Sequence, residues 1–126
     1  MALTHVAGLR DKLANLAVDE IDLNTPPGTL GFWTAAYAAE IATLTFSNPA
    51  FGAAASAVAT ASAITKESSA TAGTIAVGRI EQGAGASVMD FSVTVTSGGG
   101  DIELSSLVLS TGDEVSVTSL TYTAPV

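Results

Sequence analysis

Apolar and polar side chains alternate along residues 88–96, and this period of two limits what the chain can fold into. The apolar positions are Met89, Phe91, Val93 and Val95, and the polar positions between them are Asp90, Ser92, Thr94 and Thr96. Successive side chains of a β-strand point to opposite faces of its sheet, whereas a helix needs a longer period. The segment is therefore predicted to be a strand with one buried face.

Shorter segments with strand character lie between turn-forming residues from residue 29 onward. The sequence predicts strands over residues 29–34, 40–46, 58–64, 74–81, 88–96, 101–105, 107–109 and 114–123. Within residues 74–81 the apolar phase slips at Gly78, which predicts a β-bulge there. About seven or eight short strands at this spacing are typical of an antiparallel β-sandwich or a small barrel. The predicted fold class is therefore mainly β.

Residues 4–18 have helical spacing instead. Their apolar side chains recur every three or four positions, at Val6, Leu9, Leu13 and Leu16. We expect this stripe to pack against the rest of the protein and Thr4 to cap the helix. A chain of 126 residues is expected to form one domain. That single domain, residues 1–126, is predicted to consist of the helix over 4–18 and a β-rich body over 29–123.

The chain is strongly acidic, with twelve Asp and Glu residues against four Lys and Arg and a formal net charge of −8. A nucleic-acid binder needs basic side chains to displace counterions from the phosphates, so no nucleic-acid partner is expected. Binding to an anionic membrane surface fails for the same reason. Residues 41–65 carry no charge and are long enough to cross a bilayer. Pro49 and Gly52 would break a helix near its middle, so we predict no membrane span.

Few residues could carry catalysis or bind a metal. The chain has no cysteine, which excludes disulfides, zinc–thiolate sites and thiol nucleophiles, and His5 is its single histidine. Asp101 and Glu103 share one predicted strand face without an apolar pocket, and we interpret them as part of a solvated sheet face. The acidic residues within 19–22 lack the spacing and the glycine of a calcium-binding loop. We therefore predict no catalytic residue, no cofactor and no metal site.

Aromatic residues are scarce but gather in the first half of the chain. Phe32 and Trp33 are adjacent in a predicted strand and must point to opposite faces, so one of them can be exposed. An exposed aromatic side chain there would indicate a protein interface or a platform for sugars.

The order of segments along the chain resembles a family of small structural proteins of tailed bacteriophages and prophages. The residues that carry the resemblance are 61–65 (ASAIT), 72–80 (AGTIAVGRI), 88–90 (VMD), 101–106 (DIELSS) and 110–123 (STGDEVSVTSLTYT). The similarity covers most of the chain and is strongest after Ala61. It implies a component of the virion without enzyme activity.

Within that family the favoured role is a capsid decoration, or cement, protein on the outer surface of the shell. The resemblance implies the major capsid protein as the partner and self-association as a trimer. An acidic protein is repelled by packaged DNA, which favours the outside of the shell. A terminal arm costs little to extend, so we expect the N-terminal segment to form one contact. We expect the aromatic pair, Phe32 and Trp33, to form a second. The candidate contact residues are Ala2, Leu3, Thr4, His5, Phe32 and Trp33.

Two other classes of function stay open. The first is a tail, fibre or baseplate component that contacts host surface polysaccharide, for which an exposed Trp33 or Tyr37 would be the indication. The second is a small hydrolase, which would need two carboxylates facing each other in a cleft.

Overall fold

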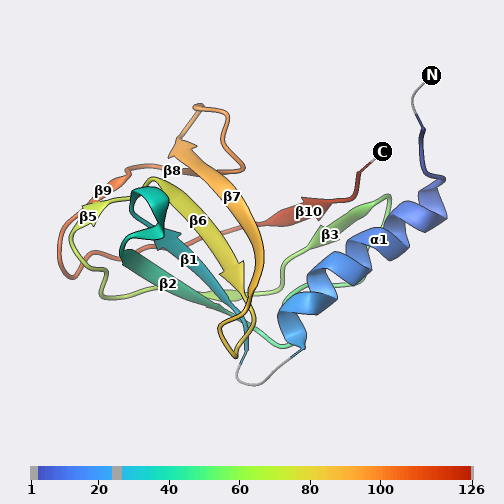
Figure 1. Cartoon of the computed structure of the whole chain (residues 1–126), viewed down its shortest axis with the longest axis horizontal. Coiled ribbons are helices and arrows are strands. Elements are labelled where there is room, and N and C mark those ends of the chain that lie inside the picture. The colour runs from blue at the N-terminus through green and yellow to red at the C-terminus, as the bar shows by residue number, and fades with distance from the viewer. Residues whose placement is uncertain (1–2, 24–26, 126) are drawn as a thin grey trace.

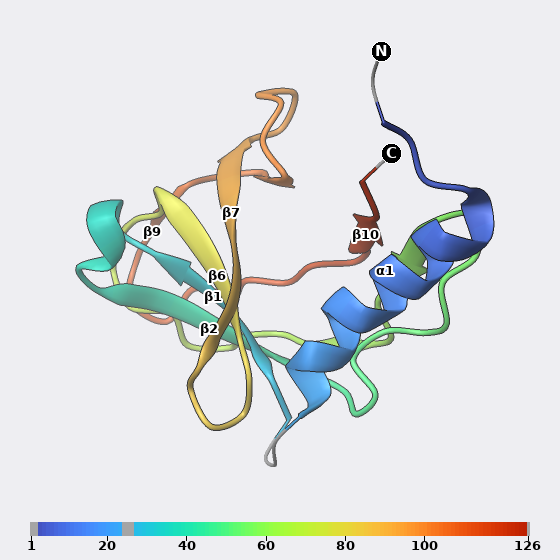
Figure 2. The ribbon, with the colours of Figure 1, turned by 45° about the vertical axis from the view of Figure 1, so that its right-hand side comes forward.

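Ten strands, one α-helix and two short 3-10 helices form the part of the chain that the computed structural model describes, residues 3–23 and 27–125. The structure is 38% strand and 16% helix. Its sheets curl into a half-barrel, and the α-helix lies to one side of it (Figures 1 and 2). The prediction of a mainly β fold with one N-terminal helix is confirmed, and the half-barrel is close to the predicted small barrel.

The main sheet has six strands in the order β4, β2, β1, β6, β7, β8. Their bounds are β1 (Thr29–Trp33), β2 (Glu40–Phe46), β4 (Ile64–Thr65), β6 (Val77–Glu81), β7 (Ser87–Val95) and β8 (Ile102–Leu104). Neighbouring strands run antiparallel except β7 and β8, which are parallel. The predicted antiparallel arrangement therefore holds except at the β8 edge.

Four further strands form two small antiparallel pairs. β3 (Val58–Thr60) pairs with β10 (Thr121–Thr123), and β5 (Gly73–Thr74) pairs with β9 (Val108–Leu109). The strand predicted over 58–64 is thus two strands, β3 and β4, in different sheets. Of the strand predicted over 114–123 only β10 is regular. Before it, Val115 and Glu67 exchange two backbone hydrogen bonds of 2.9 Å each.

The period of two in the sequence sorts the side chains of the main sheet onto two faces. On the inner face, Leu30 of β1 lies between its cross-strand partners Leu44 and Ile80, and all three are buried. The largest fully buried side chains are Phe32, Phe46, Ile21, Leu30, Leu44, Ile75 and Val18. On the outer face of the neighbouring strands, Arg79 lies opposite Asp90. The polar half of each alternation therefore faces away from the core.

Gly78 does not form the predicted bulge. The pairing of β6 with both β1 and β7 runs without interruption through Gly78, and the irregularity lies between Ile80 and Glu81. The phase slip has another cause, because residues 75 and 76 leave the sheet between β5 and β6. A Cβ at Gly78 would overlap the ring of Phe91, its partner on β7. Glycine is needed here to make room for that ring, which packs edge-on against Phe32 with centroids 6.0 Å apart.

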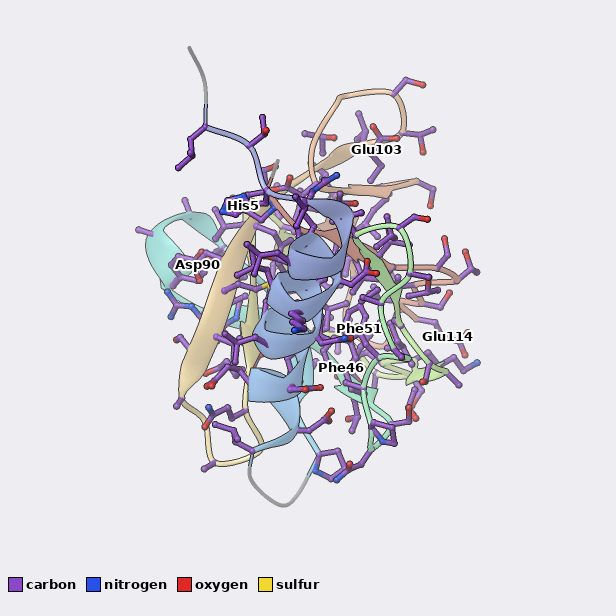
Figure 3. All side chains as sticks on the ribbon, turned by 90° about the vertical axis from the view of Figure 1, so that its right-hand side faces the viewer. His5, Phe46, Phe51, Asp90, Glu103 and Glu114 are labelled. Atoms are coloured by element: carbon purple, nitrogen blue, oxygen red, sulfur yellow. The ribbon has the colours of Figure 1, made fainter. Side chains whose placement is uncertain are left out.

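The helix α1 (Ala7–Asp19) presents a different face to the protein than the sequence predicts. Its buried residues are Ala14 and Val18, followed by Ile21 in the 3-10 helix η1 (Glu20–Asp22). The leucines expected to pack inward lie largely outside, with Leu9 and Leu16 exposed and Leu13 half-buried. Figure 3 looks onto this side and shows α1 in front of the sheets. Both the predicted packing face and the predicted cap are wrong, since Val6 occupies the N-cap and no side chain caps the helix.

Polar side chains on the inner face of α1 hold the helix to the loop of residues 50–57. Asp11 Oδ1 accepts a hydrogen bond from the Ala57 N–H at 2.6 Å, and Asn15 Oδ1 accepts one from the Ala54 N–H at 2.8 Å. Just beyond α1, the Asp22 carboxylate accepts the N–H of Ala50 at 3.0 Å. A buried backbone N–H without a partner is costly, so each acceptor stabilises the loop as well as the helix.

The Asp11 bond holds a turn of unusual backbone geometry. Ser56 and Ala57 have φ of 52° and 67°, in the left-handed region that side chains with a Cβ disfavour. They are the central residues of a two-residue turn closed by hydrogen bonds between Ala55 and Val58, a geometry that normally takes Asn-Gly. The hydrogen bond that the Ala57 N–H donates to Asp11 therefore stabilises a turn that lacks glycine.

We expect Asp11→Ala to lower the free energy of unfolding by about 1–3 kcal/mol, because it leaves the buried Ala57 N–H without an acceptor. Asp11→Asn is the matched control, since its amide oxygen can accept the same bond, and it should retain most of the stability. Urea denaturation followed by circular dichroism measures both. An Asp11→Ala variant as stable as the parent protein would show that the turn does not depend on this bond.

Candidate functional site

The N-terminal arm, residues 3–6, projects away from the body ahead of α1 (Figure 1). Leu3 is 89% exposed and Val6 is 74% exposed. Thr4 is exposed as well, and His5 is half-buried. Ala2, the remaining candidate contact in this segment, lies outside the described residues. The arm thus presents two large apolar side chains to solvent.

The exposed apolar surface continues along the outer face of α1 and onto Leu23, just beyond the 3-10 helix η1. Leu9, Leu16 and Leu23 are 42%, 63% and 61% exposed. In the described part of the chain, two other large hydrophobic side chains are exposed, Val95 and Val108. A soluble protein seldom gathers apolar side chains on one surface unless that surface binds something. The arm and α1 together are therefore the first candidate interaction surface.

Phe32 and Trp33 fall on opposite faces of β1, as adjacent strand residues must. Phe32 is fully buried in the core, so it cannot contact a neighbouring subunit, and its place among the candidate contacts is corrected. Trp33 is half-buried on the outer face. The sequence could not tell which of the two would be inside, because both are large and apolar.

Trp33, Tyr37, Arg79 and Asp90 form an aromatic cluster on the outer face of the main sheet. The rings of Trp33 and Tyr37 meet edge to face, with centroids 6.1 Å apart. The Arg79 guanidinium lies 3.8 Å from the centre of the Tyr37 ring, and its Nε bonds to Asp90 Oδ1 at 2.7 Å. The bond from Arg79 is the main reason why the pKa of Asp90 is lowered. Sequence reasoning missed the Arg79–Asp90 pair because it depends on the register between β6 and β7.

The backbone beneath Tyr37 fixes the position of its ring. Ala36 and Tyr37 have φ of 57° and 56°, within the 3-10 helix η2 (Ala35–Tyr37). The Tyr37 hydroxyl donates a hydrogen bond to the carbonyl of Gly78 at 3.2 Å. Left-handed backbone at such residues persists only where surrounding contacts stabilise it, and it is often associated with functional sites. The cluster is therefore a pre-organised, partly exposed aromatic surface.

Glu40 lies beside this cluster, opposite Trp33 across β1 and β2. Both side chains lean over Gly31, where a Cβ would lie 2.5 Å from Glu40 Oε2 and 2.8 Å from Trp33 Nε1. Partial burial raises the pKa of Glu40, and the charges of Glu81 and Glu67 add to the rise against a hydrogen bond with Thr43. Trp33 Nε1 is buried and has no hydrogen-bond partner among the described residues. The Glu40 carboxylate therefore lies next to the aromatic cluster, where it can accept hydrogen bonds.

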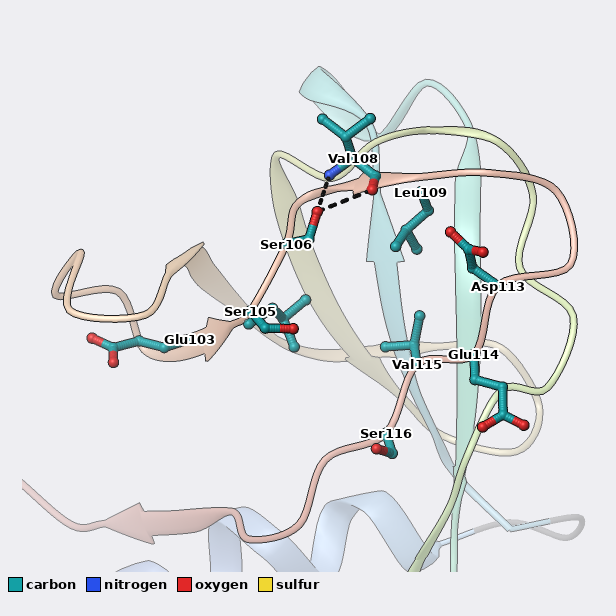
Figure 4. Close-up of a pocket in the computed structure, with 10 residues that line it drawn as sticks. Glu103, Ser105, Ser106, Val108, Leu109, Asp113, Glu114, Val115 and Ser116 are labelled. Carbon is teal, nitrogen blue, oxygen red and sulfur yellow. Dashed lines mark hydrogen bonds between the residues drawn. The ribbon is translucent and has the colours of Figure 1, made fainter.

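A cavity of about 470 Å³ lies between β8, β9 and the segment before β10 (Figure 4). Its carboxylates have structural partners. Asp113 Oδ2 accepts the Ser110 N–H at 2.8 Å, Glu114 pairs with Lys66 at 2.9 Å, and Glu103 accepts two backbone N–H groups of the 97–99 turn. Asp101 likewise accepts the N–H and the hydroxyl of Ser92. Asp101 and Glu103, which the sequence predicts on a solvated face, are exposed, and both accept backbone hydrogen bonds around the loop between β7 and β8.

A second, more apolar pocket of about 440 Å³ opens on the inner side of the half-barrel between β7, β8 and β10. Its lining includes Phe51, Met89, Phe91, Ile102 and Tyr122. Within residues 3–23 and 27–125, no group of three or more His, Cys, Asp or Glu side chains is arranged to hold a metal ion. No helix in that part of the chain has the length and hydrophobicity to cross a membrane.

We expect Glu40→Gln to increase stability at neutral pH, because the raised pKa means that folding disfavours the ionised carboxylate. A group with a raised pKa in the folded state contributes most at low pH, and this contribution is lost as the pH rises through the folded pKa. The gain from Glu40→Gln should therefore be present at pH 7, shrink as the pH falls through the raised pKa of Glu40, and be lost below the ordinary value of 4.5. Thermal unfolding at pH 3.5–8 tests it, with Asp19→Asn, at an exposed carboxylate that forms no ion pair with another described residue, as the control for removing a negative charge. A gain that does not depend on pH would contradict this account of Glu40.

Comparison with known proteins gives no family for the chain. No family model matches it, and no curated protein and no solved structure shows significant similarity to it.

Proposed function

We propose that the chain is a non-enzymatic structural protein of a tailed bacteriophage that binds the outer face of the capsid as a decoration protein. The observation that carries the proposal is the N-terminal arm, whose Leu3 and Val6 side chains are exposed ahead of α1. The resemblance of the sequence to small phage structural proteins supports the same role. The partner of the arm is the major capsid protein.

The arm has the properties of a weak contact that is repeated many times. Burying Leu3 and Val6 against a neighbour would contribute about 1.5–3 kcal/mol each before the cost of ordering the arm. A single contact of this size binds weakly, but copies on a capsid lattice that are also linked to one another gain avidity. The net charge of −8 disfavours the DNA-filled interior and suits the outer surface.

We expect Leu3→Glu and Val6→Glu to reduce occupancy on purified, expanded empty capsids by at least about tenfold, because each places a charge in an apolar contact. Co-sedimentation with the capsids measures occupancy. Val108→Glu is the matched control, because Val108 is 68% exposed but lies on β9, far from the arm in the sequence. Full occupancy by both arm variants would exclude the arm as the contact, and no binding by the parent protein would exclude decoration of that shell.

The aromatic cluster favours a second candidate function, a tail, fibre or baseplate component that contacts host surface polysaccharide. Trp33 and Tyr37 are half-exposed on one face, and carboxylates of Glu40 and Asp90 flank them. Sugar rings stack on aromatic side chains, and their hydroxyls donate hydrogen bonds to carboxylates. This combination suits a carbohydrate better than a protein arm.

Binding to polysaccharide purified from the host surface separates the two functions. For a tail component, calorimetry should detect binding by the parent protein, and Trp33→Ala should weaken it at least about tenfold through loss of a stacking surface. Tyr37→Phe keeps the ring and should bind nearly as well. For a decoration protein, neither the parent protein nor the variants bind the polysaccharide, and Trp33→Ala occupies capsids normally.

A further inference from the structure

The outer face of α1 carries a leucine stripe, defined here as Leu9, Leu16 and Leu23. Leu9 and Leu16 are seven positions apart, about 10.5 Å along α1, so they follow one line on its surface, and Leu23 follows seven positions later, just beyond η1. Leu9 and Leu16 belong to α1, and the backbone stays helical through η1 to Leu23, whose φ and ψ are −63° and −23°. The stripe points away from the buried residues Ala14 and Val18.

Two unpaired opposite charges lie along the same edge of the stripe. Lys12 precedes Leu16 by four residues and Asp19 follows it by three, which places both on one side of the leucine line. Both side chains are exposed, and neither has a hydrogen bond or an ion pair in the described part of the chain. The other three cations are engaged: Arg10 with backbone carbonyls, Lys66 with Glu114 and Arg79 with Asp90.

From this pattern we propose that two copies of the chain pair through the leucine stripe, with their α1 helices antiparallel and a two-fold axis beside Leu16. Leu16 then packs on Leu16 of the second copy, and Leu9 packs on Leu23 of the second copy. The same axis places Lys12 next to Asp19 of the second copy, and by symmetry this ion pair forms twice. The stripe and the two charges are thus complementary to a second copy of themselves.

Parallel helices do not produce this match. In a parallel pair, or in a three-fold trimer whose helices run parallel, Lys12 faces Ala17 of the next copy. The apolar stripe is satisfied by either arrangement, but the charges are satisfied only by the antiparallel one. The pairing is independent of the proposed function, because it uses the outer face of α1 and leaves Leu3 on the arm available.

The association is expected to be weak. A contact of one short helix per copy is smaller than the roughly 1,200 Å² that stable complexes usually bury. Each copy also carries a net charge of −8, and the resulting repulsion opposes pairing at low salt. Pairing should therefore be measured from about 10 µM to about 1 mM at about 0.15 M salt, where long-range repulsion is screened.

Sedimentation equilibrium of the parent protein and four variants tests the proposal. We expect a monomer–dimer equilibrium, and Leu16→Glu should weaken it at least about tenfold because two carboxylates would meet at the axis. Lys12→Glu and Asp19→Lys should each weaken it about threefold or more, and the double variant should regain the affinity of the parent protein, since it exchanges the two partners of each ion pair. Val108→Glu should dimerise like the parent protein, and circular dichroism checks that every variant is folded.

Rescue by the double exchange is the decisive result, because Lys12 and Asp19 are too far apart on one helix to bond to each other. A dimer that Leu16→Glu abolishes and that the double exchange restores supports the antiparallel pair. A monomer over the whole concentration range, a trimer, or a dimer that the double exchange does not restore would overturn it. The capsid experiment is read separately: a Leu16→Glu monomer that still occupies capsids would leave the proposed function in place.

Discussion

The structure depends on the way in which α1 is attached to the body. Three acceptor side chains, Asp11, Asn15 and Asp22, take hydrogen bonds from backbone N–H groups of the 50–57 loop. This loop leads into β3, which pairs with β10, so the helix, the loop and the C-terminal strand are fixed together. Small buried residues such as Ala14 and Ala57 let the backbones come close enough for these bonds. The attachment combines these polar bonds with the buried side chains of Ala14 and Val18, and it leaves Leu9 and Leu16 outside.

Much of the fold was predictable because the period of two is a local signal. The bounds predicted for β2 agree with the structure, those for β1 differ by one residue at its end, and those for β7 differ by one residue at each end. The failures occurred where tertiary contacts overrode the local pattern. At Gly78 the phase slip suggested a bulge, but the slip arises because residues 75 and 76 leave the sheet before β6. The glycine itself makes room for the ring of Phe91. Residues 114–120 alternate like a strand, but among them only Val115 exchanges backbone hydrogen bonds with Glu67, as an isolated bridge.

The candidate surfaces were predictable only in part, for a related reason. The sequence indicated the N-terminal segment and the aromatic pair, and Leu3 and Trp33 are accessible in the structure. It could not choose between Phe32 and Trp33, because only the curvature of the sheet decides which face becomes the core. Helical periodicity located an apolar stripe on α1 but not its direction. That direction is set by Asp11 and Asn15, whose partners lie about forty residues later in the chain.

Attachment through backbone donors also bears on how the chain can change over time. Every amino acid except proline offers the same N–H group, so the contact with α1 does not recognise the side-chain chemistry of residues 50–57. Size remains restricted where the loop is buried, at Ala50, Phe51 and Ala57, while exposed positions such as Ala53 and Ala55 are under no such restriction. Related chains could therefore diverge widely in this loop and still place the helix identically. The three acceptors on the helix side have no such freedom.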